Sequence, residues 1–476
     1  MNLVSILFKN ISEKQKLIKN TFWIFVGRFL GYLFRGFSFI FSARFLGPQL
    51  YGAFSSIYSL SSILQSFSDF GITTILTKKV SEEQEKKEEY FWGAFFLWLI
   101  FGAVLLLIGL KIFKIFIKSE INFSDKIYIF IFLALMFDLL REIGNSFIRG
   151  LEKMEIQGIF HILVNFLSFI FVFFILRKSP NLKVLSQIYF FTFLLGAVCV
   201  LYFVFRNFSK LKIKIKKEIL KKIFSESWAL GLANVLFFFN FNLTTLFLSF
   251  FHKSQEVGIF SVALRFYEVL VFFPSSLAMA IFPIISREKD KTEKFIEFGL
   301  KFSYFLIFPF ILGGIILGSD IINFLFGIKY QESYFPFLIL LLAFIFNSFL
   351  FFIVNSLISL GKRKELLIFD FINTFIVLVF SLILIPSLGA LGAAIAHSAN
   401  SVFVFFFAKK IAQKYLKFKI FKFDYIKELT LGSIFLGLIL LALKILNVNV
   451  VINILIGALI YLSLTKKSLI SLLRND

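Results

Sequence analysis

Two arginines lie inside the first long apolar segment of the chain, residues 21–46. An arginine costs about 2.5–3.5 kcal/mol at the centre of a bilayer, so facing lipid would cancel much of the segment's apolar gain. The pattern therefore predicts that Arg28 and Arg35 face a wet, protein-lined space, where each planar guanidinium can bind phosphate oxygens in pairs. The alternative is a structural ion pair with an acid of a neighbouring helix. Small and hydroxyl residues share their helical face: Gly31, Ser38 and Ser42.

A second cation stands in the eighth apolar segment. Arg265 and Glu268 are one helical turn apart, so they can pair with each other, and Ser261 and Ser275 extend the same face. We interpret Arg265 as a ligand-binding cation and Glu268 as the residue that orients it.

The remaining polar groups inside apolar segments form smaller sets. In the fourth segment, Asp138, Arg141 and Glu142 are spaced to neutralise one another, which favours a structural or gating network, with a proton or sodium relay as the alternative. Asp69 ends a serine stripe that is typical of close helix packing. Asp69 therefore caps or pairs at the interface, or takes part in coupling or gating.

The composition excludes a soluble protein. The 476 residues are 59% hydrophobic and 20% aromatic, with a mean hydropathy of +0.89, and a soluble surface of that kind would be one large apolar patch. A membrane-spanning helix needs roughly 20 mostly apolar residues. We predict an all-α, multi-pass membrane protein with about 14 spans: 21–46, 51–77, 90–117, 126–148, 156–177, 184–205, 224–251, 257–283, 297–318, 335–360, 365–387, 389–411, 429–446 and 449–465.

The net charge of +23 comes from lysines and arginines in short connections between spans, which argues against a nucleic-acid-binding face. Their alternation predicts a multi-pass protein of the cell (inner or cytoplasmic) membrane with both termini in the cytoplasm. The two largest clusters, in 206–222 and 409–427, have the spacing of segments that contact anionic headgroups. A single cysteine, Cys199, excludes a disulfide framework.

An internal repeat divides the chain into two similar halves. The segment around Gly52, after the first span, aligns with the segment around Gly258, after the seventh. An offset of six spans predicts two six-helix lobes related by an axis along the membrane normal. The expected parts are a cytoplasmic amphipathic N-terminus (1–20), an N-terminal lobe (21–205), a basic linker (206–223), a C-terminal lobe (224–411), a basic amphipathic segment (412–428), and two extra spans with a tail (429–476).

Several strings resemble the polysaccharide (O-antigen type) flippases, within the larger group that contains the multidrug (MATE) exporters and the lipid II flippase. They are FLGPQLYGAFSSIYSL with the following SDFGI, EVGIFSVALRFYEVLVFFPSSLAMAIFPIIS, FLFGIKYQES and IPSLGALGAAIAHSAN. The resemblance implies a MATE-like fold and transfer of a polyprenyl-pyrophosphate-linked oligosaccharide (an O-antigen, lipopolysaccharide, capsule or exopolysaccharide unit) to the outer leaflet. It also implies a polysaccharide polymerase and a chain-length regulator as partners, beside membrane lipids.

The resemblance also bears on individual residues. The lipid II flippase has a similar arginine, acid and proline in its eighth helix, which match Arg265, Glu268 and Pro274 here. Acidic residues bind the coupling cation in the multidrug exporters, so Asp370 is a candidate for coupling, as is His397 through its pKa near neutrality. The seventh span offers amides that either contact sugar hydroxyls or hold helices together: Asn234, Asn240 and Asn242. Many relatives carry aspartate where Asn242 stands, which weakens a cation site there.

The sequence contains no nucleotide-binding loop, no Cys/His cluster with metal-ligand spacing, and no set of nucleophile, base and orienting residue. We therefore expect no cofactor, no resident metal and no enzyme activity. The first rival function is a cation-coupled multidrug exporter, which a cavity lined by arginines disfavours. The others are a membrane-bound polymerase or ligase, which needs a long external loop, and a scaffold for glycan assembly.

Overall fold

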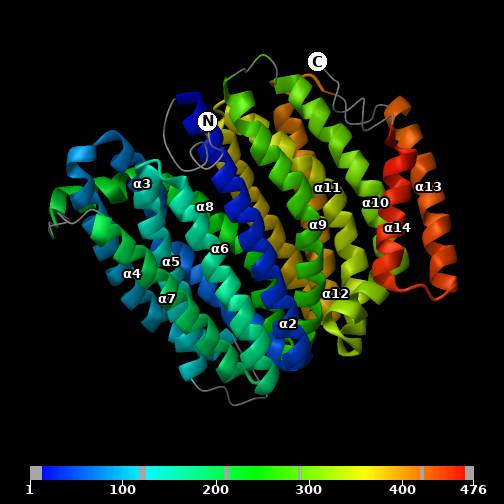
Figure 1. The fold of residues 1–476 in the computed structure, drawn as a ribbon, viewed down its shortest axis with the longest axis horizontal. Helices are drawn as coiled ribbons and strands as arrows, with labels where there is room; N and C mark the ends of the chain where they lie inside the picture. Colours follow the sequence, from blue (N-terminus) through cyan, green and yellow to red (C-terminus); the bar gives the residue numbers. More distant parts are fainter. Residues whose placement is uncertain are drawn as a thin grey trace. The chain divides into compact units, whose positions relative to one another are not determined.

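The computed structural model describes residues 13–116, 125–207, 213, 215–287, 290, 292–418 and 423–466. Every regular element in these ranges is helical, which confirms the predicted fold class. The helices shown in Figure 1 are α2 (Glu13–Asp69), α3 (Ile72–Glu82), α4 (Lys87–Phe116), α5 (Asp125–Gly150), α6 (Met154–Phe171), α7 (Leu182–Asn207), α8 (Lys217–Phe251), α9 (Ser254–Arg287), α10 (Thr292–Phe326), α11 (Tyr334–Ser359), α12 (Arg363–Ala412), α13 (Phe423–Ile445) and α14 (Val450–Leu464). Three single turns complete the list: η1 (Gln84–Lys86), the π-helical η2 (Val172–Leu176) and η4 (Ile328–Ser333).

Two of these helices are hairpins that turn without a loop. In α2 the chain turns at Gly47, whose φ of 75° lies in the left-handed region, and Pro48 begins the second arm. In α12 it turns at Gly389, with a φ of 53°, just after Pro386. Phe380 and Phe403, on opposite arms of α12, lie 5.6 Å apart between ring centroids, so the arms pack side by side. The predicted connections at these two places are therefore confirmed.

About fourteen spans result, as expected. In the described part of the chain, nine helices are long and apolar enough to cross a membrane, and two of the nine are the hairpins, with two spans each. The charged helix α5 and the two C-terminal helices α13 and α14 complete the set. The helices match the predicted spans to within a few residues at most ends.

The second predicted span, 51–77, is wrong as a continuous helix. The chain breaks between α2 and α3 at Phe70 and Gly71, which have φ values of 35° and 78°. A non-glycine residue at positive φ is strained, so the surrounding packing has to hold it in place. The hydropathy of this stretch is continuous, and an apolar window does not reveal such a break.

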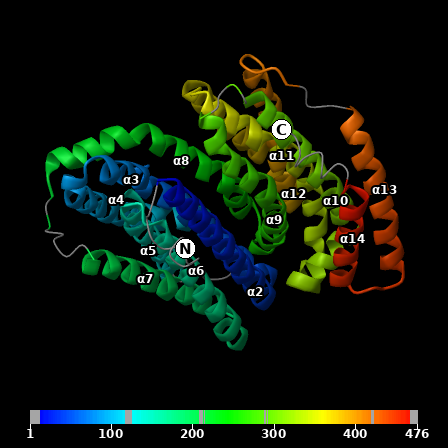
Figure 2. The same ribbon diagram turned by 45° about the horizontal axis from the view of Figure 1, so that its top comes forward.

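The chain divides into two compact units, residues 1–258 and 259–476. Helix α8 packs in the first unit, although the repeat places it in the second lobe. Its Ile219 and Ile223 belong to a buried cluster with Ile72 of α3 and Phe91 of α4, and Figure 2 shows α8 running along α3 and α4. The lobe boundaries 21–205 and 224–411 stay a prediction. Part of the basic linker, including Lys210, Lys212 and Lys214, lies outside the described residues, as do residues 1–12 of the N-terminus and 419–422.

The two segments aligned by the repeat meet in the first unit. A side chain on Gly52 would collide with the backbone of Ser254 and Gly258, and one on Gly258 would collide with the backbone of Pro48. Both positions therefore require glycine because two backbones touch there. The sequence match of Gly52 with Gly258 thus marks a physical contact between equivalent parts of the repeat.

The last two helices lie against α10 in the second unit (Figure 1). Nζ of Lys444 on α13 is 2.9 Å from Oδ2 of Asp320 and donates to the carbonyl of Ile316 at 2.6 Å. The hydroxyl of Tyr461 on α14 donates to the carbonyl of Phe305 at 2.8 Å. Polar contacts between apolar helices fix their register, because a packed hydrocarbon surface alone does not.

Candidate functional site

Arg35 lies halfway along the first arm of α2 and is half-buried. Its Nη2 donates to the hydroxyl of Tyr58 on the second arm, and its guanidinium lies 5.8 Å from the centre of the Phe39 ring. Asp138 acts on it electrostatically, but that carboxylate is bound by Arg141. Within the described residues no carboxylate lies at ion-pair distance from Arg35. Its charge is therefore held by a hydroxyl and an aromatic face rather than neutralised.

The rest of the predicted stripe divides between two environments. Arg28 is exposed, two turns before Arg35 on the same arm. Ser38 and Ser42 are buried, and the hydroxyl of Ser38 donates to the carbonyl of Phe34 in its own helix. The two hydroxyls thus serve packing, whereas the arginines remain candidates for binding.

Two residues beside this stripe escaped the sequence reasoning. Tyr58 contacts Arg35 because the chain turns at Gly47, nearly midway between them. His161 of α6 lies edge-on to Tyr32, with ring centroids 5.9 Å apart. Folding the sequence back on itself at Gly47 would have paired Arg35 with Tyr58. No sequence signal brings His161 here, because that contact depends on packing of α6 against α2 (Figure 2).

The charged residues in the second half of α5 pair with one another. Nη2 of Arg141 is 2.7 Å from Oδ1 of Asp138, one turn away, as the spacing predicts. Nη1 of Arg149 is 2.5 Å from Oε1 of Glu142, two turns away. Asn145 Nδ2 donates to the same glutamate at 3.3 Å. These pairs fit the structural or gating interpretation, and the relay alternative stays untested.

Asp69 lies at the break between α2 and α3. Its Oδ1 accepts from the backbone N–H of Thr73 at 3.1 Å, so this side chain bonds the first turn of α3 from two residues before the N-cap residue Gly71. Its Oδ2 accepts from Nδ2 of Asn234 on α8 at 3.5 Å. The carbonyl of Phe70 and the backbone of Gly231 approach each other so closely that a side chain on Gly231 would not fit. The break between α2 and α3 thus lies directly against α8.

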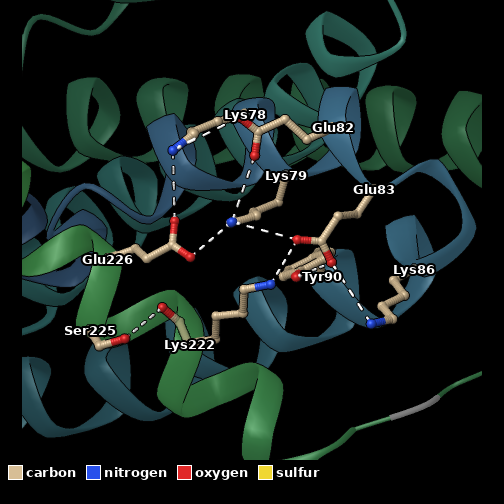
Figure 3. A network of polar contacts seen from close by, with 9 residues as sticks. All are labelled: Lys78, Lys79, Glu82, Glu83, Lys86, Tyr90, Lys222, Ser225 and Glu226. Atoms are coloured by element: carbon tan, nitrogen blue, oxygen red, sulfur yellow. Dashed lines mark hydrogen bonds and ion pairs between the residues drawn. The ribbon is translucent and has the colours of Figure 1, made fainter.

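An ion-pair network joins the same elements further along. We define the α3–α8 network by its members in Figure 3: Lys78, Lys79, Glu82, Glu83, Lys86, Tyr90, Lys222, Ser225 and Glu226. Buried Lys79 lies 2.8 Å from Oε1 of Glu226 on α8. Lys222 of α8 lies 2.7 Å from Oε1 of Glu83, whose Oε2 accepts from the Tyr90 hydroxyl at 2.8 Å. The network ties the start of α8 to α3, η1 and α4.

The hydrogen bond from Lys222, with that from Tyr90, lowers the pKa of Glu83 from 4.5 to about 2. A carboxylate with a lowered folded-state pKa stabilises the fold above its unfolded pKa and loses that effect as the pH falls towards the folded value. We expect Glu83→Gln to lower the melting temperature at pH 7. The difference from wild type should shrink between pH 4.5 and about 2. Thermal unfolding across this range measures it. Glu85→Gln, an exposed neighbour in η1, is the matched control and should show no such dependence.

In the second unit, the predicted pair of α9 is present: Nη1 of Arg265 lies 2.7 Å from Oε2 of Glu268. Nearby, Asn347 of α11 donates to Tyr267 at 2.6 Å and to Ser401 at 3.0 Å. His397 lies edge-on to the Tyr267 ring. This cluster joins α9, α11 and α12.

The other candidates lie in different settings. The half-buried Asp370 carboxylate has no hydrogen bond or ion pair within the described residues, and Asn373 accepts from Asn400 at 2.8 Å. Buried Asn242 donates to the carbonyl of Phe238 in its own helix at 3.0 Å, and Asn240 is half-buried. Among the residues that the structure describes, no group of His, Cys, Asp and Glu could hold a metal ion.

Comparison with known proteins adds family evidence. Residues 17–289 match the family model described as polysaccharide biosynthesis protein. The chain is 24% identical over 466 residues to the probable low-salt glycan biosynthesis flippase Agl15 of Haloferax volcanii, covering 94% of this chain and 95% of that protein. It is 24% identical over 402 residues to a putative O-antigen transporter of Shigella flexneri, covering 81% and 95%.

The fold is also similar to that of a solved structure. The lipid II flippase MurJ in an inward closed conformation superposes with a TM-score of 0.78 and 17% identity, over 96% of this chain and 100% of that one. At this identity the likeness concerns the fold, and it confirms the MATE-like architecture expected from the sequence.

Proposed function

Because the chain belongs to the polysaccharide biosynthesis protein family, we propose that it is a flippase for a polyprenyl-pyrophosphate-linked oligosaccharide. It moves the repeat unit of an O-antigen, capsule or exopolysaccharide from the cytoplasmic to the outer leaflet of the cell membrane. The names of relatives aligned over most of their length support this substrate class.

The environment of Arg35 carries the proposal. The other arginines that make ion pairs in apolar helices have a carboxylate at 2.5–2.7 Å, namely Arg141, Arg149 and Arg265. Arg35 has a hydroxyl and a ring instead. A cation inside a span without its own carboxylate attracts an anion, and pyrophosphate offers oxygens in the geometry that a guanidinium binds in pairs.

Further residues take supporting roles in this proposal. Arg28 extends the cationic face of α2, and Arg265 supplies a cation from the second unit, oriented by Glu268 at 2.7 Å. Asn234, Asn240 and Asn242 remain candidates for sugar contacts, although Asn234 bonds Asp69 and Asn242 bonds its own helix.

Transport requires alternating access, and the α3–α8 network is suited to control it. Helix α8 begins inside the basic linker, at Lys217, so rocking about residues 206–223 moves α8 against α3 and α4. We assign the network the role of a latch that holds α8 down and opens as the substrate enters. The surface ion pairs in it are individually weak, so a cluster of them can be broken and remade.

Few of the candidate residues are available to couple transport to a proton or sodium ion. Asp138, Arg141 and Glu142 are engaged with charged partners, and Asp69 bonds the first turn of α3. Asp370 stands out because its carboxylate has no partner within the described residues. His397 packs against Tyr267, which favours a structural role for it.

The assay for this function is flipping in reconstituted vesicles. Purified protein faces a fluorescent polyprenyl-pyrophosphate oligosaccharide, and transfer is followed with and without an imposed proton or sodium gradient. Flipping supports the proposal. Efflux of a cationic dye without flipping would replace it by the alternative, a MATE-like multidrug exporter. The expected partners, a polymerase and a chain-length regulator, take up the product on the outer side.

A further inference from the structure

One end of the second unit carries a group of exposed lysines. We define the lysine rim as Lys364, at the start of α12, and Lys410, Lys414 and Lys417, at and beyond its end. All four are exposed, and none forms an ion pair within the described residues. Like charges held close together repel, so the rim favours an anion from outside the protein.

The chain after α12 is fixed so that its lysines point outward. Leu416 and Phe418 are buried, whereas the residues between and before them are exposed. The backbone N–H of Lys417 donates to Oε1 of Glu293, before the first full turn of α10, at 2.6 Å. Two apolar anchors and a backbone bond therefore hold residues 414–418 against the unit.

The acids near the rim are already in use. Oε1 of Glu365 accepts from the Tyr415 hydroxyl at 2.7 Å, and Nζ of Lys362 lies 3.8 Å from the centre of the same ring. Glu293 is bound to backbone rather than to a lysine side chain. Neither carboxylate therefore lies at ion-pair distance from a described rim lysine, although the charge of Glu365 still acts on Lys364.

In the first unit, by contrast, several described lysines form ion pairs with glutamates. In the α3–α8 network (Figure 3), lysines and glutamates alternate, and Lys79 alone lies within 4.0 Å of three glutamates. Lys216, just before α8, lies 2.7 Å from Glu89. Those charges are satisfied inside the protein. Among the described residues, Lys79, Lys216 and Lys222 thus have carboxylate partners, whereas the four rim lysines have none.

The position of the rim selects the kind of anion. It lies where membrane-crossing helices begin and end, beside Tyr415, whose ring is 40% exposed. Aromatic rings with a polar tip and lysines are enriched at the headgroup level of a bilayer. We propose that the lysine rim binds the phosphate groups of anionic phospholipids in the leaflet at this end of the second unit.

Lipid retention tests the rim without requiring transport, so failure of the flippase assignment would not affect the result. Protein is placed in nanodiscs of phosphatidylglycerol and phosphatidylcholine, and co-purified lipids are counted by native mass spectrometry. The variant Lys364→Gln/Lys410→Gln/Lys414→Gln/Lys417→Gln should lose about tenfold or more of its preference for phosphatidylglycerol, since each lysine near an anionic surface contributes about fivefold. Replacing the same four lysines with arginine should preserve the preference.

The matched control removes four exposed cations at other connections: Arg177, Lys178, Lys183 and Lys329. Their replacement by glutamine should leave the phosphatidylglycerol preference of the wild type unchanged. An equal loss in both quadruple variants would mean that net charge alone attracts the lipid. Unchanged retention in the rim variant would mean that these lysines only face solvent. Either result overturns the proposal.

Discussion

Flipping by the Arg35→Ala variant is expected to be about ten- to a hundredfold slower than wild type, with normal insertion and folding. Hydrogen bonds to a charged group are worth about 1.5–3 kcal/mol each, and every 1.4 kcal/mol is a factor of ten. The side chain contacts the hydroxyl of Tyr58 and the ring of Phe39. Within the described residues, no carboxylate lies at ion-pair distance from it. Removing this side chain therefore weakens substrate binding more than it destabilises the fold. The vesicle assay with the fluorescent pyrophosphate-linked substrate measures the rate.

Two companions make the Arg35 experiment decisive. Arg35→Lys keeps the charge but loses the planar fork, so it should fall between wild type and alanine. Arg177→Gln removes an exposed cation at the end of the predicted span 156–177, and it should have no effect. Normal flipping by an Arg28→Ala/Arg35→Ala double variant that inserts and folds would refute the cationic-face mechanism.

Cross-linking α4 to α8 is expected to reduce flipping to background. An ideal Cβ on Gly93 would lie 3.4 Å from Cγ2 of Ile219, so the two side chains touch and cysteines there are close enough to be bridged. In a Cys199→Ser background, Gly93→Cys/Ile219→Cys should flip after reduction and stop after oxidation, because the latch cannot release α8. The assay is the same vesicle system with reductant or oxidant added.

A second cross-link serves as the control. An ideal Cβ on Gly432 of α13 would lie 3.1 Å from Cγ2 of Thr465, just after α14. Gly432→Cys/Thr465→Cys joins two helices that the latch does not involve, and its oxidation should leave flipping intact. Persistent flipping by the oxidised α4–α8 variant would show that α8 stays fixed to the first unit during transport.

Much of the architecture could be predicted from the sequence because span length and loop charge are local properties. The turns at Gly47 and Gly389 carry proline and glycine, which end helices in any context. The pairs Asp138–Arg141 and Arg265–Glu268 follow from helical spacing alone. The structure of these turns and ion pairs is determined by residues that are close together in the sequence.

The rest depended on contacts between distant stretches. Lys79 and Glu226 are far apart in sequence, and neither stretch of sequence contains a pattern that predicts their contact. The break at Phe70 is stabilised by packing on Gly231 of α8. The hydropathy of the local sequence therefore does not reveal it. Tyr58 joined the site only because the hairpin brought it to Arg35. The sequence repeat placed α8 in the second lobe, whereas side-chain packing places it against α3 and α4 of the first unit.

The place of α8 has a consequence for how the protein is made. The buried cluster of the first unit includes Ile219 and Ile223, and its closing glycine contact uses Gly258. A nascent chain that ends after α7 therefore leaves Ile72 and Phe91 uncovered and Glu83 without Lys222. The first unit cannot be completed until the ribosome has passed the start of α9. Ile72 and Phe91 thus stay uncovered while the ribosome makes the lysine-rich linker and α8.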